Sequence, residues 1–124
     1  MRIVGISSPK LIVVGCTFLI AAALSACGGA NTSDPISACK STVSAICDRS
    51  FQCFPTESQQ FYGSVANCNA AVSAHSCTPT LTTCPAGLAF NSDAASRCVD
   101  DYRNVSCPDI LNGILPASCN QTCN

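Results

Sequence analysis

The chain has 124 residues, about the length of one domain, and 12 of them are cysteine. Only 10% of the residues are charged, the formal net charge is -1, and His75 is the single histidine. These numbers exclude a basic surface for nucleic acid and a metal site built from several histidines. Cysteine at this density is typical of a small oxidised scaffold outside the cytosol.

The first 26 residues have the pattern of a signal peptide. Arg2 and Lys10 are their only charged residues, and residues 11–26 form an uncharged run that is shorter than a membrane-spanning helix. This run ends in Leu24-Ser25-Ala26-Cys27, which resembles a bacterial lipobox. The resemblance implies that Cys27 receives diacylglycerol and that acyl chains anchor the mature protein to a membrane. The alternative is an ordinary signal peptide cleaved at Ala26 or Ala30.

The resemblance places the protein in the bacterial cell envelope. Gly28 follows Cys27, whereas an aspartate there would resemble the inner-membrane retention signal, so we expect the outer membrane. Residues 27–124 carry four basic and seven acidic side chains, a net charge of -3, so attraction to nucleic acid is not expected. We interpret residues 27–33 as a lipidated N-terminus with a flexible tether, and residues 34–124 as one cysteine-rich domain.

The apolar periodicity predicts a small, disulfide-rich, all-α domain. Asp34 predicts the N-cap of a helix that Pro55 ends. Thr56 and Gln59 form a capping box that predicts a second helix to about Ala74, antiparallel to the first.

The second part of the domain has weaker patterns. A loop is expected between Cys77 and Asn91, because threonine, proline and glycine dominate that segment. Asn91 or Ser92 then caps a third helix to about residue 103, and Ser106 caps a short helix that Gly113 closes. The tail is expected to be irregular or a single turn.

Ten cysteines remain in the mature chain once Cys27 is lipidated, and an even number in an oxidising compartment predicts five disulfides. Ten cysteines allow on the order of 900 pairings, so spacing alone does not fix the connectivity. The geometry of an antiparallel helical hairpin favours the pairs Cys47–Cys68 and Cys39–Cys77. A third pair, Cys84–Cys123, would link the predicted loop to the C-terminal tail. Four cysteines are left unassigned: Cys53, Cys98, Cys107 and Cys119.

No sequence pattern predicts catalysis, a metal site or a cofactor. Neither Cys-x-x-Cys, typical of redox and zinc sites, nor the nucleophile motif Gly-x-Ser-x-Gly occurs. We interpret His75 as a solvated or capping residue near a helix end, and Asp101 of the pair Asp100-Asp101 as solvent-facing. We therefore expect a protein that is not an enzyme.

One part of the domain has a distinctive order of cysteine and aromatic residues. It consists of Cys47-Asp48-Arg49, then Phe51 and Cys53, and then residues 61–68, which read Phe-Tyr-Gly-Ser-Val-Ala-Asn-Cys. This order is similar to that of small cysteine-rich lipoproteins and secreted proteins of myxobacterial type, over about residues 39–119. Later positions also fit the pattern: Cys77, Cys98, Cys107, Pro116 and Cys119. Two cysteines look like additions consistent with an extra bridge: Cys84 and Cys123. The resemblance carries over no catalytic or binding residue.

Two functions of different classes fit these observations. The first is a non-enzymatic lipoprotein with a structural or partner-binding role, which predicts an exposed apolar patch for an unknown protein. The second is a small carrier of a lipid or other apolar ligand, which predicts an apolar pocket of roughly 300 Å³ or more. Such a pocket is expected to be lined by residues such as Phe61, Val65, Val72 and Leu88. The aromatic residues near the hairpin turn are interpreted as its core, with a pocket lining or an exposed patch as alternatives: Phe51, Phe54, Phe61 and Tyr62.

Overall fold

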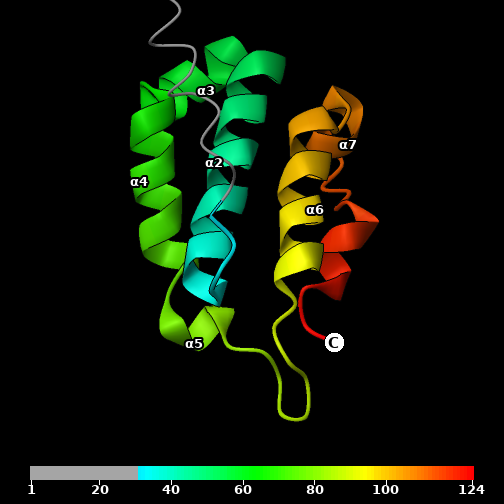
Figure 1. Ribbon diagram of the computed structural model, residues 1–124. Helices are drawn as coiled ribbons and strands as arrows, with labels where there is room; N and C mark the ends of the chain where they lie inside the picture. The colour runs from blue at the N-terminus through cyan, green and yellow to red at the C-terminus, as the bar shows by residue number, and fades with distance from the viewer. Residues whose placement is uncertain (1–30) are drawn as a thin grey trace, which may run out of the picture.

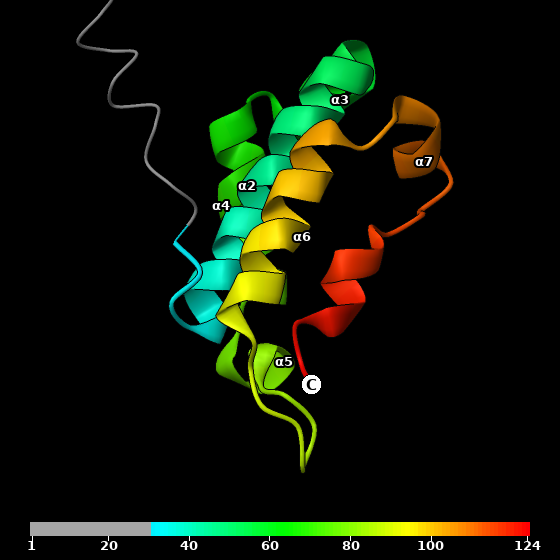
Figure 2. The same cartoon turned by 45° about the vertical axis from the view of Figure 1, so that its right-hand side comes forward.

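The computed structural model describes residues 31–124, so the leader and Cys27 lie outside the described part. Within that part, the helices are arranged around α2, which lies between α4 and α6 (Figure 1, Figure 2). In chain order they are α2 (Pro35–Cys53), α3 (Pro55–Tyr62), α4 (Val65–Ser76), α5 (Pro79–Thr82), α6 (Ser92–Asn104), α7 (Cys107–Leu111) and the 3-10 helix η1 (Ala117–Gln121). The described residues therefore form the all-α domain that the sequence predicts.

α2 begins where the sequence predicts. The carboxylate of Asp34 accepts hydrogen bonds from the backbone amides of Ile36 and Ser37, both at 3.0 Å. The helix stops before Phe54, whose backbone leaves the helical region because the ring of Pro55 crowds the residue before it.

The second predicted helix is wrong in two respects. It begins at Pro55 without a side-chain cap, instead of after a capping box at Thr56, because proline is already suited to the first helical position. It is also divided into α3 and α4, since the chain turns at Gly63 with a φ of 73°, a value that glycine adopts without strain. Ser64 then caps α4 by accepting a hydrogen bond from the amide of Asn67 at 3.2 Å.

The predicted loop between the second and third helices contains a single helical turn, α5. Two threonine hydroxyls stabilise it by donating to backbone carbonyls one turn earlier, Thr82 to Thr78 at 2.9 Å and Thr83 to Pro79 at 2.6 Å. The rest of that segment is the expected loop. α6 and α7 begin after the predicted caps, Asn91 and Ser106.

The loop before α6 pairs with the C-terminal tail. Phe90 and Cys123 form an isolated antiparallel bridge, the only β-type pairing among residues 31–124. None of the helices in this range is both long and apolar enough to span a bilayer.

The core is small and divided into two clusters, one on each side of α2. The α2–α4 cluster contains Val43, Cys47, Cys68 and Cys77, and the α2–α6 cluster contains Ala45, Cys98, Val99 and Tyr102. Half of these eight residues are cysteines, so disulfide sulfur supplies much of the buried volume. A core of this size stabilises a domain weakly, which makes the covalent links important to the fold.

Candidate apolar binding cleft

All ten cysteines of the described part are in disulfides, which are Cys39–Cys77, Cys47–Cys68, Cys53–Cys107, Cys84–Cys123 and Cys98–Cys119. The first, second and fourth are the pairs that the sequence analysis favours. The other two join the four cysteines that it leaves unassigned. Residues 31–124 therefore contain no free thiol to act as a nucleophile or metal ligand.

Two disulfides join the first half of the domain, α2 to α5, to the second half, α6 to η1. Cys53–Cys107 links the end of α2 to the start of α7, next to the C-terminal end of α6 (Figure 1). Cys84–Cys123 links the chain after α5 to the tail, next to the N-terminal end of α6. No disulfide joins α2 to α6 directly, although these two helices pack against each other along their length.

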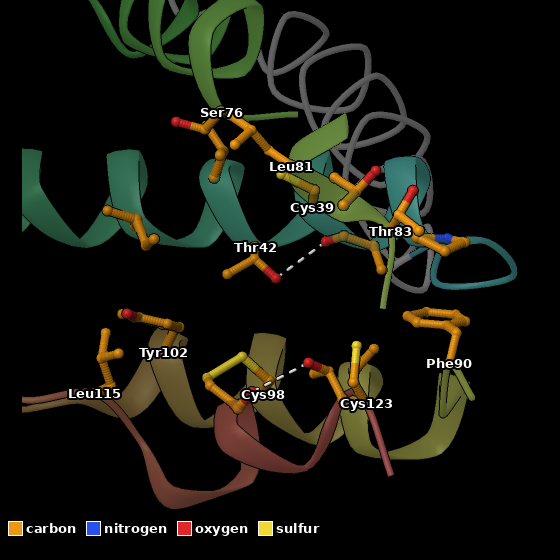
Figure 3. Close-up of a pocket in the computed structure, with 18 of the residues that line it drawn as sticks. Cys39, Thr42, Ser76, Leu81, Thr83, Phe90, Cys98, Tyr102, Leu115 and Cys123 are labelled. Carbon is orange, nitrogen blue, oxygen red and sulfur yellow. Dashed lines mark hydrogen bonds between the residues drawn. A yellow bond between two sulfur atoms is a disulfide. The ribbon is translucent and has the colours of Figure 1, made fainter. Parts of the chain in front are cut away.

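A cleft of about 620 Å³ lies between these two halves. Figure 3 shows α2 along one side of the cleft and α6 with η1 along the other. Thr42 of α2 and Tyr102 of α6 project toward each other's helix, while Phe90 and Leu115 lie near opposite ends. This volume falls within the range of about 300–1,000 Å³ that is common for small-molecule sites.

The lining of the cleft is uncharged and mostly apolar. It contains no lysine, arginine, histidine, aspartate or glutamate. Its larger apolar side chains are Val43, Ile46, Val72, Leu81, Phe90 and Leu115. All four of its threonine hydroxyls already donate to backbone carbonyls, for example Thr42 to Ala38 at 3.0 Å and Thr122 to Cys119 at 3.2 Å. The lining therefore presents mainly hydrocarbon and disulfide sulfur to a ligand.

Tyr102 is the main polar feature of this lining. Its side chain is 8% exposed and belongs to the α2–α6 cluster, and its hydroxyl lies in the gap between α2 and α6 (Figure 3). Burial raises the pKa of Tyr102 above its ordinary value of 10.0. The phenol is thus a neutral O–H donor at any physiological pH.

Two exposed leucines border the cleft. Leu81 is 67% exposed and Leu115 is 57% exposed, and both belong to the lining. Large apolar side chains at the rim of an apolar cleft are typical of a site whose ligand is itself apolar.

The predicted pocket lining is mostly wrong. Only Val72 of the four expected residues lines the cleft. Phe61 is 87% exposed, Leu88 is 47% exposed, and Val65 packs against the α2–α4 cluster. The missed signal is a second face of α2, on which Ala38, Thr42 and Ile46 follow one another at spacings of four, beside the face that carries the hairpin disulfides.

The prediction of an aromatic core at the hairpin turn is wrong for Phe61. Phe51 and Tyr62 do pack against the α2–α4 cluster. Phe61, the residue before Tyr62 in α3, is instead exposed, and its ring centroid is 6.1 Å from that of Tyr62. The turn at Gly63 ends α3 after two turns, so the apolar periodicity does not continue into one buried face.

The polar residues considered in the sequence do not form a reactive group. His75 is exposed in the last turn of α4, and Asp100 forms an ion pair with Arg103 at 2.9 Å. Asp101 accepts a hydrogen bond from the Ser118 hydroxyl. Within residues 31–124, no three His, Cys, Asp or Glu side chains are arranged to hold a metal ion.

Comparison with known proteins adds no relative. Neither a family model, nor a curated protein, nor a solved structure matches this chain. Among the features of the described residues, the cleft between α2 and α6 combines the volume and the lining that a ligand site requires.

Proposed function

We propose that this protein is a non-enzymatic, lipid-anchored module of the bacterial cell envelope that binds an apolar ligand in the cleft between α2 and α6. The observation that supports this most directly is a cleft of about 620 Å³ with no charged side chain in its lining. Binding sites for apolar molecules combine such a lining with a few polar groups that orient the ligand. The disulfides would hold the cleft in a preformed state, which lowers the entropic cost of binding.

The proposed anchor would keep the cleft beside a membrane. Leu24-Ser25-Ala26-Cys27 resembles a lipobox, and Asp34, where the domain begins, is seven positions after Cys27. A chain of that length spans at most about 25 Å. The anchored protein would therefore work next to a bilayer, which is a reservoir of apolar molecules.

A partner-binding role is the second candidate, because three large apolar side chains are exposed close together in the sequence. Leu111 is 73% exposed, Ile114 is 54% exposed and Leu115 is 57% exposed. Replacement of Leu111 and Ile114 by alanine would weaken a partner complex and leave a ligand in the cleft unaffected, since neither residue lines the cleft.

Native mass spectrometry of the full-length protein, extracted from its own membranes, tests the proposed ligand. We expect a non-covalent adduct with the mass of a lipid-sized molecule, which denaturation removes. Thr42→Lys introduces a charge into the cleft and should abolish the adduct. Ser44→Lys is the matched control, because Ser44 lies on the same helix outside the lining. A wild-type protein without an adduct, or an adduct that survives Thr42→Lys, would contradict binding in the cleft.

The denatured mass tests the proposed anchor separately. We expect the mass of residues 27–124 plus covalent acyl chains, and we expect Cys27→Ser to lack those chains. A wild-type protein that carries no acyl chain would disprove the lipid anchor, whatever the result for the cleft.

A further inference from the structure

We propose that the cleft selects neutral apolar molecules that carry a hydrogen-bond acceptor, such as acyl esters, and that the Tyr102 hydroxyl donates to that acceptor. This inference rests on the proposed function and specifies the chemical class of its ligand. It follows from two properties of the lining, which are the absence of charged side chains and the presence of a phenol hydroxyl that no protein group accepts from.

The lining disfavours an ionised ligand. A carboxylate in the cleft would lose its water without gaining a cation, because no lysine, arginine or histidine lines the cleft. Burial of an uncompensated charge costs far more than burial of a carbonyl group. A fatty acid anion should therefore bind more weakly than the ester of the same chain.

The lining favours a ligand with an acceptor. The threonine hydroxyls of the lining donate to carbonyls of their own helical turns, at Thr42, Thr82, Thr83 and Thr122. Within residues 31–124, no hydrogen bond joins the Tyr102 hydroxyl to the protein, and this atom is not among the fully buried ones, so it remains accessible from the cleft. Ser76 is at the exposed rim. A pure hydrocarbon in the cleft would leave the phenol unpaired, whereas an ester carbonyl would accept its proton in a hydrogen bond.

The position of this donor is fixed by the fold. The Tyr102 ring packs in the α2–α6 cluster with Cys98 and Val99, and the Cys98–Cys119 disulfide holds η1 against the same face of α6. A donor that is held in place before binding loses little entropy when the ligand arrives. The hydroxyl can thus discriminate between ligands of the same chain length.

A neutral acyl ester could come from two sources. One is the lipid of the surrounding membrane, and the other is the diacylglyceryl group that the lipobox resemblance implies on Cys27. The two sources share the same chemistry, so the experiment includes an arm that separates them.

Photo-labelling of the full-length protein in its native membranes tests the inference. Three probes share one diazirine-bearing sixteen-carbon chain, and they end in a methyl ester, a free acid at about pH 8, or a plain hydrocarbon. Labelling of peptides from α2 and α6 is measured relative to bulk membrane protein, which corrects for partitioning into the bilayer. We expect the ester to label these peptides about fivefold more than either other probe, as the gain of one hydrogen bond would give.

Tyr102→Phe identifies the donor. We expect it to remove the preference for the ester, so that ester and hydrocarbon label equally, because the variant loses the hydrogen bond to the ester and also the unpaired hydroxyl that disfavours the hydrocarbon. Tyr62→Phe is the matched control, because Tyr62 packs against the α2–α4 cluster and does not line the cleft. Equal labelling by acid and ester, or ester labelling that survives Tyr102→Phe, would overturn the inference and leave apolar binding intact. Absence of labelling by both ester and hydrocarbon would overturn the proposed function itself.

The source of the ester is identified with Cys27→Ala, which is compared with wild type after both are solubilised in the same detergent, because the variant also lacks the proposed anchor. Increased ester labelling in this variant would assign the cleft to the protein's own diacylglyceryl group, which no longer competes with the probe. Unchanged labelling would assign the cleft to a diffusible lipid, and both results support the neutral-ester chemistry.

Discussion

Arg49 connects α2 to the chain that follows α6. Its Nε donates to the backbone carbonyl of Val105 at 2.8 Å, across 56 positions of sequence, and its Nη1 donates to the Gln52 side chain at 2.9 Å. The run Cys47-Asp48-Arg49 thus contains a fully buried disulfide cysteine and a donor that joins the two halves of the domain. The structure gives both residues a role in holding the fold.

Arg49→Ala should reduce the free energy of unfolding by about 1–2 kcal/mol, because a partly buried hydrogen bond from a charged donor is lost. Chemical denaturation with the disulfides intact measures this change. Arg97→Ala, at an exposed position of α6, should change the stability by less than about 0.5 kcal/mol. Equal effects of the two substitutions would show that the bond to Val105 contributes nothing to stability.

At the residue scale, the sequence identifies local interactions and misses distant ones. The caps at Asp34, Asn91 and Ser106 were predictable because each side chain bonds an amide two or three residues away. The bond from Arg49 to Val105 was not predictable, since it depends on the position of α6 relative to α2.

The N-terminus of α2, the longest helix of the described part, depends on a single carboxylate. Hydrogen bonds from the side chain and backbone amide of Ser37 lower the pKa of Asp34 below its ordinary value of 3.8, although burial opposes the change slightly. A carboxyl group with a lowered pKa in the folded state stabilises the protein above the pKa of the unfolded state. That contribution is lost as the pH falls through the lower, folded-state pKa.

Asp34→Asn should therefore reduce the pH dependence of stability in acid. The amide still accepts hydrogen bonds at the N-cap but does not titrate, so we expect a smaller loss of stability than in wild type between about pH 6 and about pH 2.5. Thermal unfolding at both pH values measures the difference. Asp48→Asn, at an exposed position of the same helix, should follow the wild-type profile. An unchanged profile for Asp34→Asn would contradict a role for the ionised cap.

At the element scale, periodicity predicts helices that bury one continuous face and fails where a helix is short. The turn at Gly63, where φ is positive, divides one predicted helix into two. The periodicity of apolar residues does not predict this turn, because it carries no information about φ. The turn at α5 depends on threonine-to-backbone hydrogen bonds in a segment whose composition favours a loop.

At the scale of the whole molecule, the sequence predicts the disulfides of the helical hairpin but not the packing of the two halves of the domain against each other. Cys47–Cys68 and Cys39–Cys77 follow from the geometry of two antiparallel helices. Cys53–Cys107 requires the position of α7 relative to α2, and no local pattern encodes it. Most of the lining of the cleft was missed for the same reason, because it comes from both halves of the domain and forms only after they assemble.

The two disulfides that join the halves should control the cleft more than the hairpin disulfides do. Cys53–Cys107 and Cys84–Cys123 lie near opposite ends of α6, and between them α2 and α6 are joined by the non-covalent packing of the α2–α6 cluster. Loss of either link would let that end of α6 separate from α2. Loss of Cys47–Cys68 would loosen α4 and leave the distance between α2 and α6 unchanged.

Paired alanine substitutions test whether the disulfides that join the two halves control the cleft more than the hairpin disulfides do. Removal of any one of these disulfides should reduce the free energy of unfolding by about 2–4 kcal/mol. Cys53→Ala with Cys107→Ala should also increase hydrogen exchange in α6 and reduce ester labelling of the cleft, because the two halves then open at one end. Cys47→Ala with Cys68→Ala should increase exchange in α4 and leave labelling near the wild-type level. If both pairs of substitutions reduced labelling in proportion to lost stability, the domain would open as one cooperative unit, and the cleft would not depend on the links at its ends.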